Sequence, residues 1–290
     1  MSSERVARGA PAPDRVVWID GLLLRGEAAQ VSVFDRGAHD GAAIFETFRV
    51  HDGHPFLWGR HLERMVLAAA ELGFPVPPSP TTLRAGLAAT LEANALTDAV
   101  ARITVTRGIA GGRPTRTGCW IEAEPVGGRL WRGTRTGQGS VILSRRPFTP
   151  GVLGAYKTTS RLAYTLAHEE ARAAGADETI LLTNKGEVLE GSASNVFLHI
   201  DGQIATPSHN TGILAGITRA FALQACYDLG YRLRTSAIWR DELSIADEVF
   251  LTNAVQGIVS VTTVGGRAVK AGRVATQVRE ALAAAIVARR

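Results

Sequence analysis

The sequence predicts a mixed α/β (α+β) protein built from two domains, and three observations support this fold class. The order of the expected elements, with a β-hairpin near the start and a β-meander in the second half, fits two mixed domains better than one doubly wound sheet. Residues 125–139 turn to Gly, Arg and Thr with little periodicity, as a linker does. The 290 residues suffice for two domains of ordinary size. We therefore expect domains at residues 1–124 and 140–290, joined by the linker 125–139.

Short strands and two helices are expected in the first domain. Asp20-Gly21 separates the apolar runs 16–19 and 22–24, which is typical of a β-hairpin. A helix is predicted from Arg60 to Leu72, because Gly73 closes it and Pro75 stops it. The other expected elements are strands at 44–50, 100–106 and 119–124 and a helix at 82–93.

The second domain is expected to combine a β-meander with helices. A helix is predicted over residues 160–174, because apolar side chains recur on one face and Gly175 ends it. Turn signals at Lys185-Gly186 and Asp201-Gly202 divide the meander into its strands. The expected elements are strands at 141–144, 178–183, 188–190, 195–200, 203–205 and 249–252, a helix at 216–229 and an alanine-rich C-terminal helix.

The composition excludes several classes of protein. A hydrophobic content of 46% and a charged content of 20% are those of a globular protein, and no apolar run is long enough to cross a bilayer. The net charge of +5 suggests nucleic acid, but the arginines are scattered and aromatic residues are only 6%. Without an apolar signal region or metal-like cysteine spacing, we expect a cytoplasmic protein that binds no metal, membrane or nucleic acid.

The 32 basic side chains include only three lysines, and Lys157 is the one in an unusual place. Lys185 and Lys270 lie in apparent turns, whereas Lys157 stands at the start of an alanine-rich helix. A desolvated lysine can become neutral and form an imine with a carbonyl, whereas the pKa of arginine stays too high for this. Lys157 is therefore the first candidate for covalent chemistry, with a solvated or ion-paired lysine as the alternative.

Three further segments each supply a part that a pyridoxal phosphate site needs. Gly216-Ile217-Thr218 opens a helix, whose unpaired N–H groups can bind an anion. Glu190 ends a strand before small polar residues, and a protonated pyridine nitrogen would pair such a carboxylate. Arg64 shares a helix face with His61 and can grip a phosphate with two hydrogen bonds. The alternatives are a hydrated helix start, an exposed turn glutamate and a helix-surface arginine.

The order and intervals of these motifs strongly resemble the class IV aminotransferases. This family comprises branched-chain aminotransferases, D-amino acid aminotransferases, (R)-selective amine transaminases and 4-amino-4-deoxychorismate lyase. The resemblance runs from about Val16 to Val264. The motifs that carry it are Asp35-Arg-Gly-Ala-His-Asp-Gly, Phe45-Glu-Thr-Phe-Arg49, His61-x-x-Arg64, Thr106-Arg-Gly, Lys157, Glu190-Gly-Ser-Ala-Ser-Asn195, Gly212-Ile-Leu-Ala-Gly-Ile-Thr-Arg219 and Ala246-Asp-Glu-Val-Phe250.

The resemblance implies pyridoxal 5'-phosphate as cofactor and the two-domain fold type IV, with the active site between the domains. It also implies a homodimer whose partner subunit completes the substrate pocket. Lys157 matches the lysine that holds the cofactor and moves the proton, and Glu190 matches the carboxylate on the pyridine nitrogen. The remaining implied cofactor contacts are Arg64, Ser194, Asn195, Gly216, Ile217, Thr218, Thr252 and Asn253. Ala254 stands where the branched-chain enzymes have a threonine, so the resemblance does not carry the usual phosphate contact over to this position.

The substrate is expected to contact Phe45, Thr47, Arg49 and Arg113, with the two arginines as receptors for its carboxylate. The loop that carries Arg113 resembles both the D-amino acid enzymes, although Thr115 replaces their histidine, and the lyase. Thr47 stands where the lyase commonly has threonine. Asp40, in place of a tyrosine, and the lack of Gly-Gly-Asn-Tyr after Lys157 weigh against a branched-chain enzyme.

We therefore expect a transaminase that moves an amino group from a D-amino acid, with (R)-amines as further donors, to a keto acid such as 2-oxoglutarate or pyruvate. The alternative is 4-amino-4-deoxychorismate lyase, which forms 4-aminobenzoate and pyruvate. A third interpretation, from another class, is a protein of this fold that binds no cofactor and serves as a scaffold or nucleic-acid binder.

Overall fold

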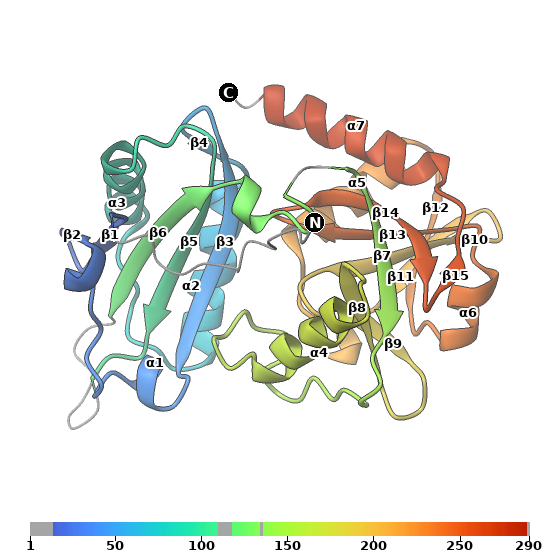
Figure 1. Ribbon diagram of the computed structural model, residues 1–290, viewed down its shortest axis with the longest axis horizontal. Coiled ribbons are helices and arrows are strands. Elements are labelled where there is room, and N and C mark those ends of the chain that lie inside the picture. Colours follow the sequence, from blue (N-terminus) through green and yellow to red (C-terminus); the bar gives the residue numbers. More distant parts are fainter. Residues whose placement is uncertain (1–13, 110–117, 134–135, 289–290) are drawn as a thin grey trace, which may run out of the picture. The chain divides into compact units, whose positions relative to one another are not determined.

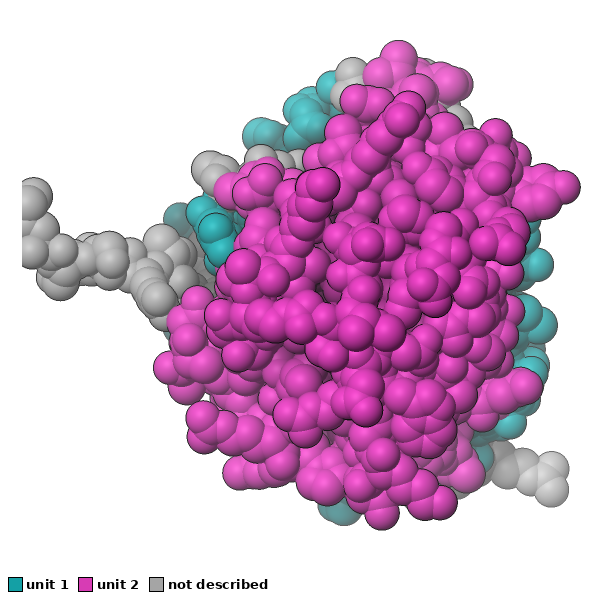
Figure 2. All heavy atoms as spheres, turned by 90° about the vertical axis from the view of Figure 1, so that its right-hand side faces the viewer, with its two compact units in different colours: residues 1–133, 157–160, 290 teal, residues 134–156, 161–289 magenta. Residues whose placement is uncertain are grey.

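The computed structural model describes residues 14–109, 118–133 and 136–288, which form two compact units (Figure 1). Unit 1 extends to Gly133 and also includes Lys157–Ser160. Of the described residues, unit 2 comprises 136–156 and 161–288 (Figure 2). The first unit thus ends inside the predicted linker, and a short segment of the second half of the chain belongs to it.

Unit 1 is an antiparallel sheet with strand order β2-β1-β6-β5-β3-β4, covered on one face by two helices. Phe48 in β3 lies 5.4 Å from the ring of Trp58 in α2, and Trp18 in β1 packs against Gly86 in α3. The strands are β1 (Val16–Ile19), β2 (Leu22–Arg25), β3 (Ala43–His51), β4 (His54–Pro55), β5 (Ala99–Thr106) and β6 (Cys119–Pro125). The helices are α1 (Arg36–His39), α2 (Trp58–Glu71) and α3 (Pro80–Ala93), with 3-10 turns at Gly26–Ala28 and Gly127–Arg129.

Local signals explain these elements. Asp20 and Gly21 have φ values of 48° and 100°, the positive angles that a tight hairpin turn requires. Gly73, with φ of 65°, follows the end of α2 as predicted. The Ser79 side chain accepts a hydrogen bond from Thr82 N and Pro80 occupies the first turn, so α3 begins there.

Unit 2 contains a nine-stranded sheet of order β12-β11-β10-β13-β14-β7-β8-β9, with β15 paired to β14. The buried rings of Phe197 and Phe250 stack in its interior, with their centroids 4.8 Å apart. The strands are β7 (Gln138–Leu143), β8 (Glu178–Leu182), β9 (Val188–Gly191), β10 (Asn195–Ile200), β11 (Gln203–Pro207), β12 (Arg232–Ser236), β13 (Glu248–Asn253), β14 (Gly257–Val264) and β15 (Arg267–Ala268). The helices are α4 (Leu162–Ala173), α5 (Ile217–Asp228), α6 (Arg240–Ile245) and α7 (Arg273–Val287), with a 3-10 turn at His209–Thr211.

The mixed α/β fold class predicted from the sequence is confirmed, but one helix starts later than expected. The helix predicted from Ser160 begins at Leu162, because the preceding residues are extended and pair with β3 in unit 1. In residues 14–109, 118–133 and 136–288, no helix is long and apolar enough to pass through a bilayer.

Candidate active site

Lys157 is held in unit 1 by the main chain of β3. Phe45 N donates to Lys157 O at 2.8 Å, Thr158 pairs with Ile44, and Thr159 N donates to Ala43 O at 2.8 Å. The Lys157 Nζ lies 4.6 Å from the centroid of the Phe45 ring. Lys157 is partly buried, whereas Lys185 and Lys270 are exposed as predicted. The backbone pairing therefore fixes the point from which this lysine extends.

The predicted substrate residues of β3 lie on one face of the unit 1 sheet. Side chains alternate along a strand, so Phe45, Thr47 and Arg49 face away from the helices that pack against Phe48. All three are buried. The fourth predicted residue, Arg113, lies outside the described residues.

Arg102 on the neighbouring strand β5 was not predicted. It is the register partner of Thr47, and its Cζ lies 3.8 Å from the centroid of the same Phe45 ring that contacts Lys157. Arg102 Nε donates to Thr104 Oγ1 at 3.2 Å. An arginine inside a strand of β-branched and apolar residues was the signal in the sequence that could have indicated it.

The opposite face of β3 carries Glu46, which binds both members of the predicted His61/Arg64 pair. Arg64 donates through Nε to Glu46 Oε1 at 2.7 Å and through Nη2 to Oε2 at 2.6 Å. His61 Nδ1 lies 2.7 Å from Glu46 Oε2. Burial alone would raise the pKa of Glu46, but the charge of Arg64 and these hydrogen bonds lower it to about 2. Burial lowers the pKa of His61, so Glu46 is an anion whose charge is neutralised by Arg64.

Glu190, at the end of β9 in unit 2, is a buried carboxylate and not an exposed turn residue. Its Oε1 accepts from Tyr164 Oη at 3.3 Å, and its Oε2 accepts from Asn195 Nδ2 at 3.3 Å and Leu214 N at 3.2 Å. The pKa of Tyr164 is raised, first by burial and then by the charge of Glu190. The carboxylate is therefore oriented by groups from a helix, a strand and a loop.

The start of α5 lies against Asn195. Asn195 Nδ2 donates to Leu214 O at 3.0 Å, and a Cβ on Gly216 would lie 1.9 Å from Asn195 Oδ1. Only glycine therefore fits at the N-cap of α5 with this arrangement. Ile217 begins the helix, and the following residue, Thr218, is buried.

Thr252 on β13 is the register partner of Asn195, and its Oγ1 has no hydrogen-bond partner among the described residues although it is buried. A buried hydroxyl without a partner costs about 1–3 kcal/mol, so this atom fits a site for a polar ligand. Asn253 Oδ1 instead accepts from Val255 N at 2.9 Å and Gln256 N at 2.6 Å. Ser194 Oγ donates to the buried Glu178 at 3.1 Å. The side chains of Asn253 and Ser194 thus stabilise local turns.

The described residues hold no group of His, Cys, Asp and Glu suited to a metal ion. Unit 2 instead combines a buried carboxylate, a helix start with glycine at its N-cap and a buried hydroxyl lacking a partner. Unit 1 carries a lysine amine beside an aromatic ring.

Comparison with known proteins identifies the family. Residues 43–264 match the family model described as amino-transferase class IV. The chain is 31% identical over 262 residues to a putative branched-chain-amino-acid aminotransferase of Methanocaldococcus jannaschii, covering 87% of this chain and 89% of the relative. It is 32% identical over 260 residues to aminodeoxychorismate lyase of Bacillus subtilis, covering 86% of each. It is 29% identical over 258 residues to D-alanine aminotransferase of Bacillus licheniformis, covering 88% and 90%.

A solved structure of a similar enzyme has a similar fold. The T.th. branched-chain amino acid aminotransferase with pyridoxamine 5'-phosphate matches with a TM-score of 0.84 and 29% identity, over 96% of this chain and 95% of that one. The chain therefore belongs to the class IV aminotransferases, and it is a pyridoxal-phosphate-dependent enzyme. The family and the cofactor predicted from the motifs are confirmed. The relatives differ among themselves in the substrates that their names state.

Proposed function

We propose that this enzyme is a transaminase that takes the amino group of a D-amino acid, with (R)-amines as further donors, and passes it to a keto acid such as 2-oxoglutarate or pyruvate. The observation that carries this proposal is the polar face beside Lys157 in unit 1. The Lys157 amine lies against the ring of Phe45, and Thr47, Arg49 and Arg102 belong to the same face.

The polarity of this face indicates which substrates it suits. Arginine binds carboxylates with two parallel hydrogen bonds, so Arg102 and the buried Arg49 are suited to the carboxylates of an amino acid and a keto acid. A branched aliphatic side chain would gain little here, because it needs an apolar surface. Several relatives are named as branched-chain enzymes, but Asp40 and the segment after Lys157 depart from that branch. The preference for the D-form rests on the sequence features of the loop that carries Arg113.

The roles proposed for the chain's own residues follow from their chemistry. Bound pyridoxal phosphate supplies an electron-withdrawing ring that stabilises the charge left when the substrate carbon loses a proton. Lys157 would hold the cofactor through its Nζ, and the same amine is the base that would move that proton. Glu190 keeps the ring nitrogen protonated. In unit 2 the N–H groups of Ile217 and Thr218 and the Thr252 hydroxyl would bind the cofactor phosphate. Arg64 in unit 1 is the further candidate for a phosphate contact.

The decisive experiment compares amino donors with purified enzyme and added cofactor. We expect D-alanine plus 2-oxoglutarate to yield pyruvate faster than L-leucine or L-valine yields its keto acid. Turnover confined to the branched-chain L-amino acids would overturn the proposed donor. A protein that stays colourless with added pyridoxal phosphate would overturn the whole proposal and favour a scaffold role.

Two substitutions test the proposed roles. Lys157→Ala should abolish turnover and the borohydride-reducible adduct, whereas Lys185→Ala, at an exposed turn, should retain both. Glu190→Gln should keep the bound cofactor but lower kcat by about a hundredfold, the scale of losing one positioned acid–base group. Wild-type turnover by Glu190→Gln would remove Glu190 from the mechanism.

The second candidate function is 4-amino-4-deoxychorismate lyase. It is favoured by Thr47, a buried hydroxyl residue on the face that carries Phe45, and by the similarity to the Bacillus subtilis lyase. Formation of 4-aminobenzoate from aminodeoxychorismate, without transamination of D-alanine, would establish it. Thr47→Val should then abolish lyase turnover while cofactor binding persists.

A further inference from the structure

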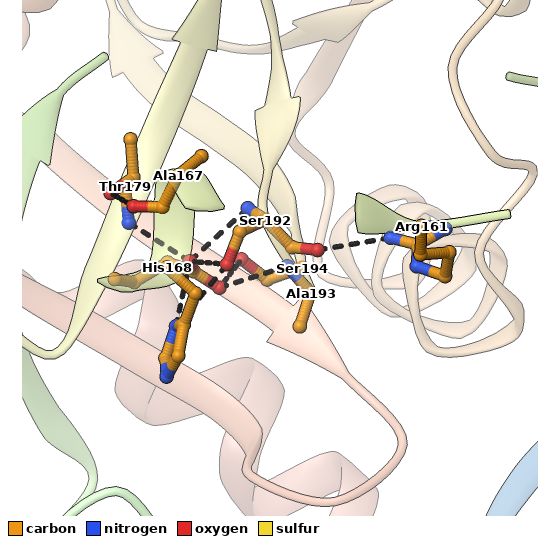
Figure 3. A network of polar contacts seen from close by, with 8 residues as sticks. Arg161, Ala167, His168, Thr179, Ser192, Ala193 and Ser194 are labelled. Atoms are coloured by element: carbon orange, nitrogen blue, oxygen red, sulfur yellow. Dashed lines mark hydrogen bonds and ion pairs between the residues drawn. The ribbon is translucent and has the colours of Figure 1, made fainter. Parts of the chain in front are cut away.

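Glu178 is a second buried carboxylate in unit 2, outside the set of residues proposed to contact the cofactor. It begins β8 and is fully buried. Its Oε1 accepts from Thr179 N at 2.9 Å and from both the N and the Oγ of Ser192, with Ser192 N at 3.1 Å. Its Oε2 accepts from Ala193 N at 3.1 Å and Ser194 Oγ at 3.1 Å. Figure 3 shows Ser192, Ala193 and Ser194, which belong to the turn between β9 and β10, and Thr179, which belongs to β8.

This turn, residues 191–194, separates Glu190 from Asn195. Gly191 N donates to Ser194 O at 2.6 Å, which closes the turn. A Cβ on Gly191 would lie 2.1 Å from Ser194 Oγ and 3.2 Å from Glu178, so the turn is packed tightly against the carboxylate. Because Glu190 and Asn195 are the residues on either side, the shape of the turn decides where both side chains start.

Two groups from the region of α4 support the turn from outside. Arg161 Nη2 donates to Ser192 O at 3.0 Å (Figure 3). His168 Nδ1 lies 3.3 Å from Ser192 Oγ and 3.8 Å from Glu178 Oε1. Burial alone would raise the pKa of Glu178, but the hydrogen bonds of His168, Ser192 and Thr179 lower it. Glu178 therefore stays an anion, which makes its hydrogen bonds to the turn strong.

We propose that Glu178 is a positioning residue for the cofactor carboxylate: its two oxygens fold the turn 191–194 and thereby fix the directions of Glu190 and Asn195. This inference rests on the proposed role of Glu190. Asn195 Nδ2 donates to Glu190 Oε2 at 3.3 Å, so a displaced turn would separate two groups that orient each other. Asn195 also lies against the start of α5, so the displacement would reach the phosphate-binding helix.

A glutamine at position 178 would keep the shape of the side chain but lose one acceptor. Its NH₂ group would have to face the Ser192 donors or the Ala193 N–H, and either choice leaves a buried donor without its partner. Glu178→Gln is therefore a test of the charge and the acceptors at nearly constant volume.

Glu248 offers a matched control in the same unit. It is also a buried carboxylate that accepts from backbone N–H groups, those of Val274 at 3.0 Å and Ala275 at 2.8 Å. These groups begin α7, which contains none of the proposed site residues. Glu248→Gln should therefore perturb the fold in the same way without touching the turn 191–194.

The experiment measures the thermal midpoint, the affinity of the apoenzyme for pyridoxal phosphate by fluorescence titration, the absorbance maximum of the bound cofactor, and kcat and KM. We expect both variants to lower the midpoint. Only Glu178→Gln should weaken cofactor affinity by about tenfold or more, shift the absorbance maximum and lower kcat more than it changes KM. Equal effects of the two variants on cofactor affinity, or unchanged affinity in Glu178→Gln, would overturn the inference.

Ser192→Ala provides a milder variant should Glu178→Gln fail to fold. It removes one hydroxyl donor to Glu178 and leaves the carboxylate in place. We expect cofactor affinity to fall about threefold, in line with the loss of one hydrogen bond, and an unchanged affinity would contradict the inference. If wild-type enzyme itself binds no cofactor or transfers no amino group, the proposed function fails instead, and the two failures are distinct.

Discussion

At the scale of single residues, the buried ion pair between Glu46 and Arg64 is central to unit 1. Glu46 binds both the Nε and the Nη2 of Arg64 and also contacts His61. A carboxylate without these partners would be too costly to bury. The pair therefore holds the Arg64 guanidinium in one orientation.

Glu46→Gln should lower the free energy of unfolding by about 3 kcal/mol, because it leaves the Arg64 charge largely buried without its counter-ion. The wild type should also lose stability as the pH falls from about 4.5 towards 2. The folded pKa of Glu46 is lowered to about 2, so only the unfolded state takes up a proton in that window. Urea unfolding at pH 7 and at low pH measures both effects.

The control for this prediction is Glu63→Gln on the same helix. Glu63 is exposed and contacts Arg60 at 3.3 Å, so its loss should cost less than about 0.5 kcal/mol. Equal destabilisation by the two substitutions would mean that the Glu46 pair contributes no more than a surface contact.

Tyr164→Phe should lower kcat several-fold while the cofactor stays bound. The Tyr164 hydroxyl donates to Glu190 Oε1, and one hydrogen bond of this kind contributes about 1 kcal/mol. The apolar contacts of the ring with Phe148, 4.7 Å between centroids, are retained in the variant. Steady-state kinetics test it against Tyr227→Phe at an exposed site, and identical kcat values would show that Tyr164 only fills space.

At the scale of elements, the start of α5 depends on Gly216. Gly216→Ala would bring a methyl group to 1.9 Å from Asn195 Oδ1, so either Asn195 or the helix start must move. We expect cofactor affinity to fall about tenfold or more, because the N–H groups of the first turn would be displaced. Gly59→Ala in α2 is the control, since its Cβ would meet nothing within 4 Å. Equal affinities in the two variants would contradict a phosphate role for α5.

The sequence allowed most elements to be predicted, because their signals are local. The hairpin at Asp20-Gly21, the end of α2 at Gly73 and the antiparallel pairs β8–β9 and β10–β11 follow from turn residues. The predicted single meander is wrong, because β9 and β10 are not neighbours in the sheet: β10 lies between β11 and β13, and β9 pairs with β8. The strand β12 was missed, because its polar residues 232–236 pair with β11 alone at the sheet edge. The strand β14 was also missed, although its run 257–264 is rich in β-branched residues, so that signal was present.

At the scale of the whole molecule, the sequence could not show which distant segments meet. Lys157 was predicted as the reactive residue from its rarity, but its pairing with β3 joins positions more than a hundred residues apart. Glu46, Tyr164 and Glu178 were missed for the same reason. Each gains its role from a partner on another element, and neither composition nor periodicity reveals such partners.

An exposed apolar surface on unit 1 bears on how copies of the chain assemble. Unit 1 exposes an apolar strip formed by Val31, Val33, Phe34 and Ile109, of which Val33 is 71% and Phe34 67% exposed. A β-bridge between Asp35 and Ile109 brings Ile109 beside the residue that follows Phe34. Contiguous exposed apolar side chains mark interaction surfaces. With the homodimer implied by the family resemblance, we expect this strip to bind a second copy of the chain.

Light scattering after size-exclusion chromatography should give twice the chain mass for the wild type. The double substitution Val33→Glu with Phe34→Glu should give the monomer mass, because four charges per dimer would have to be buried without partners. Val76→Glu is the control, since Val76 is 90% exposed outside the strip, and it should remain dimeric. A monomeric wild type, or a double variant that still dimerises, would show that this surface is not where two copies meet.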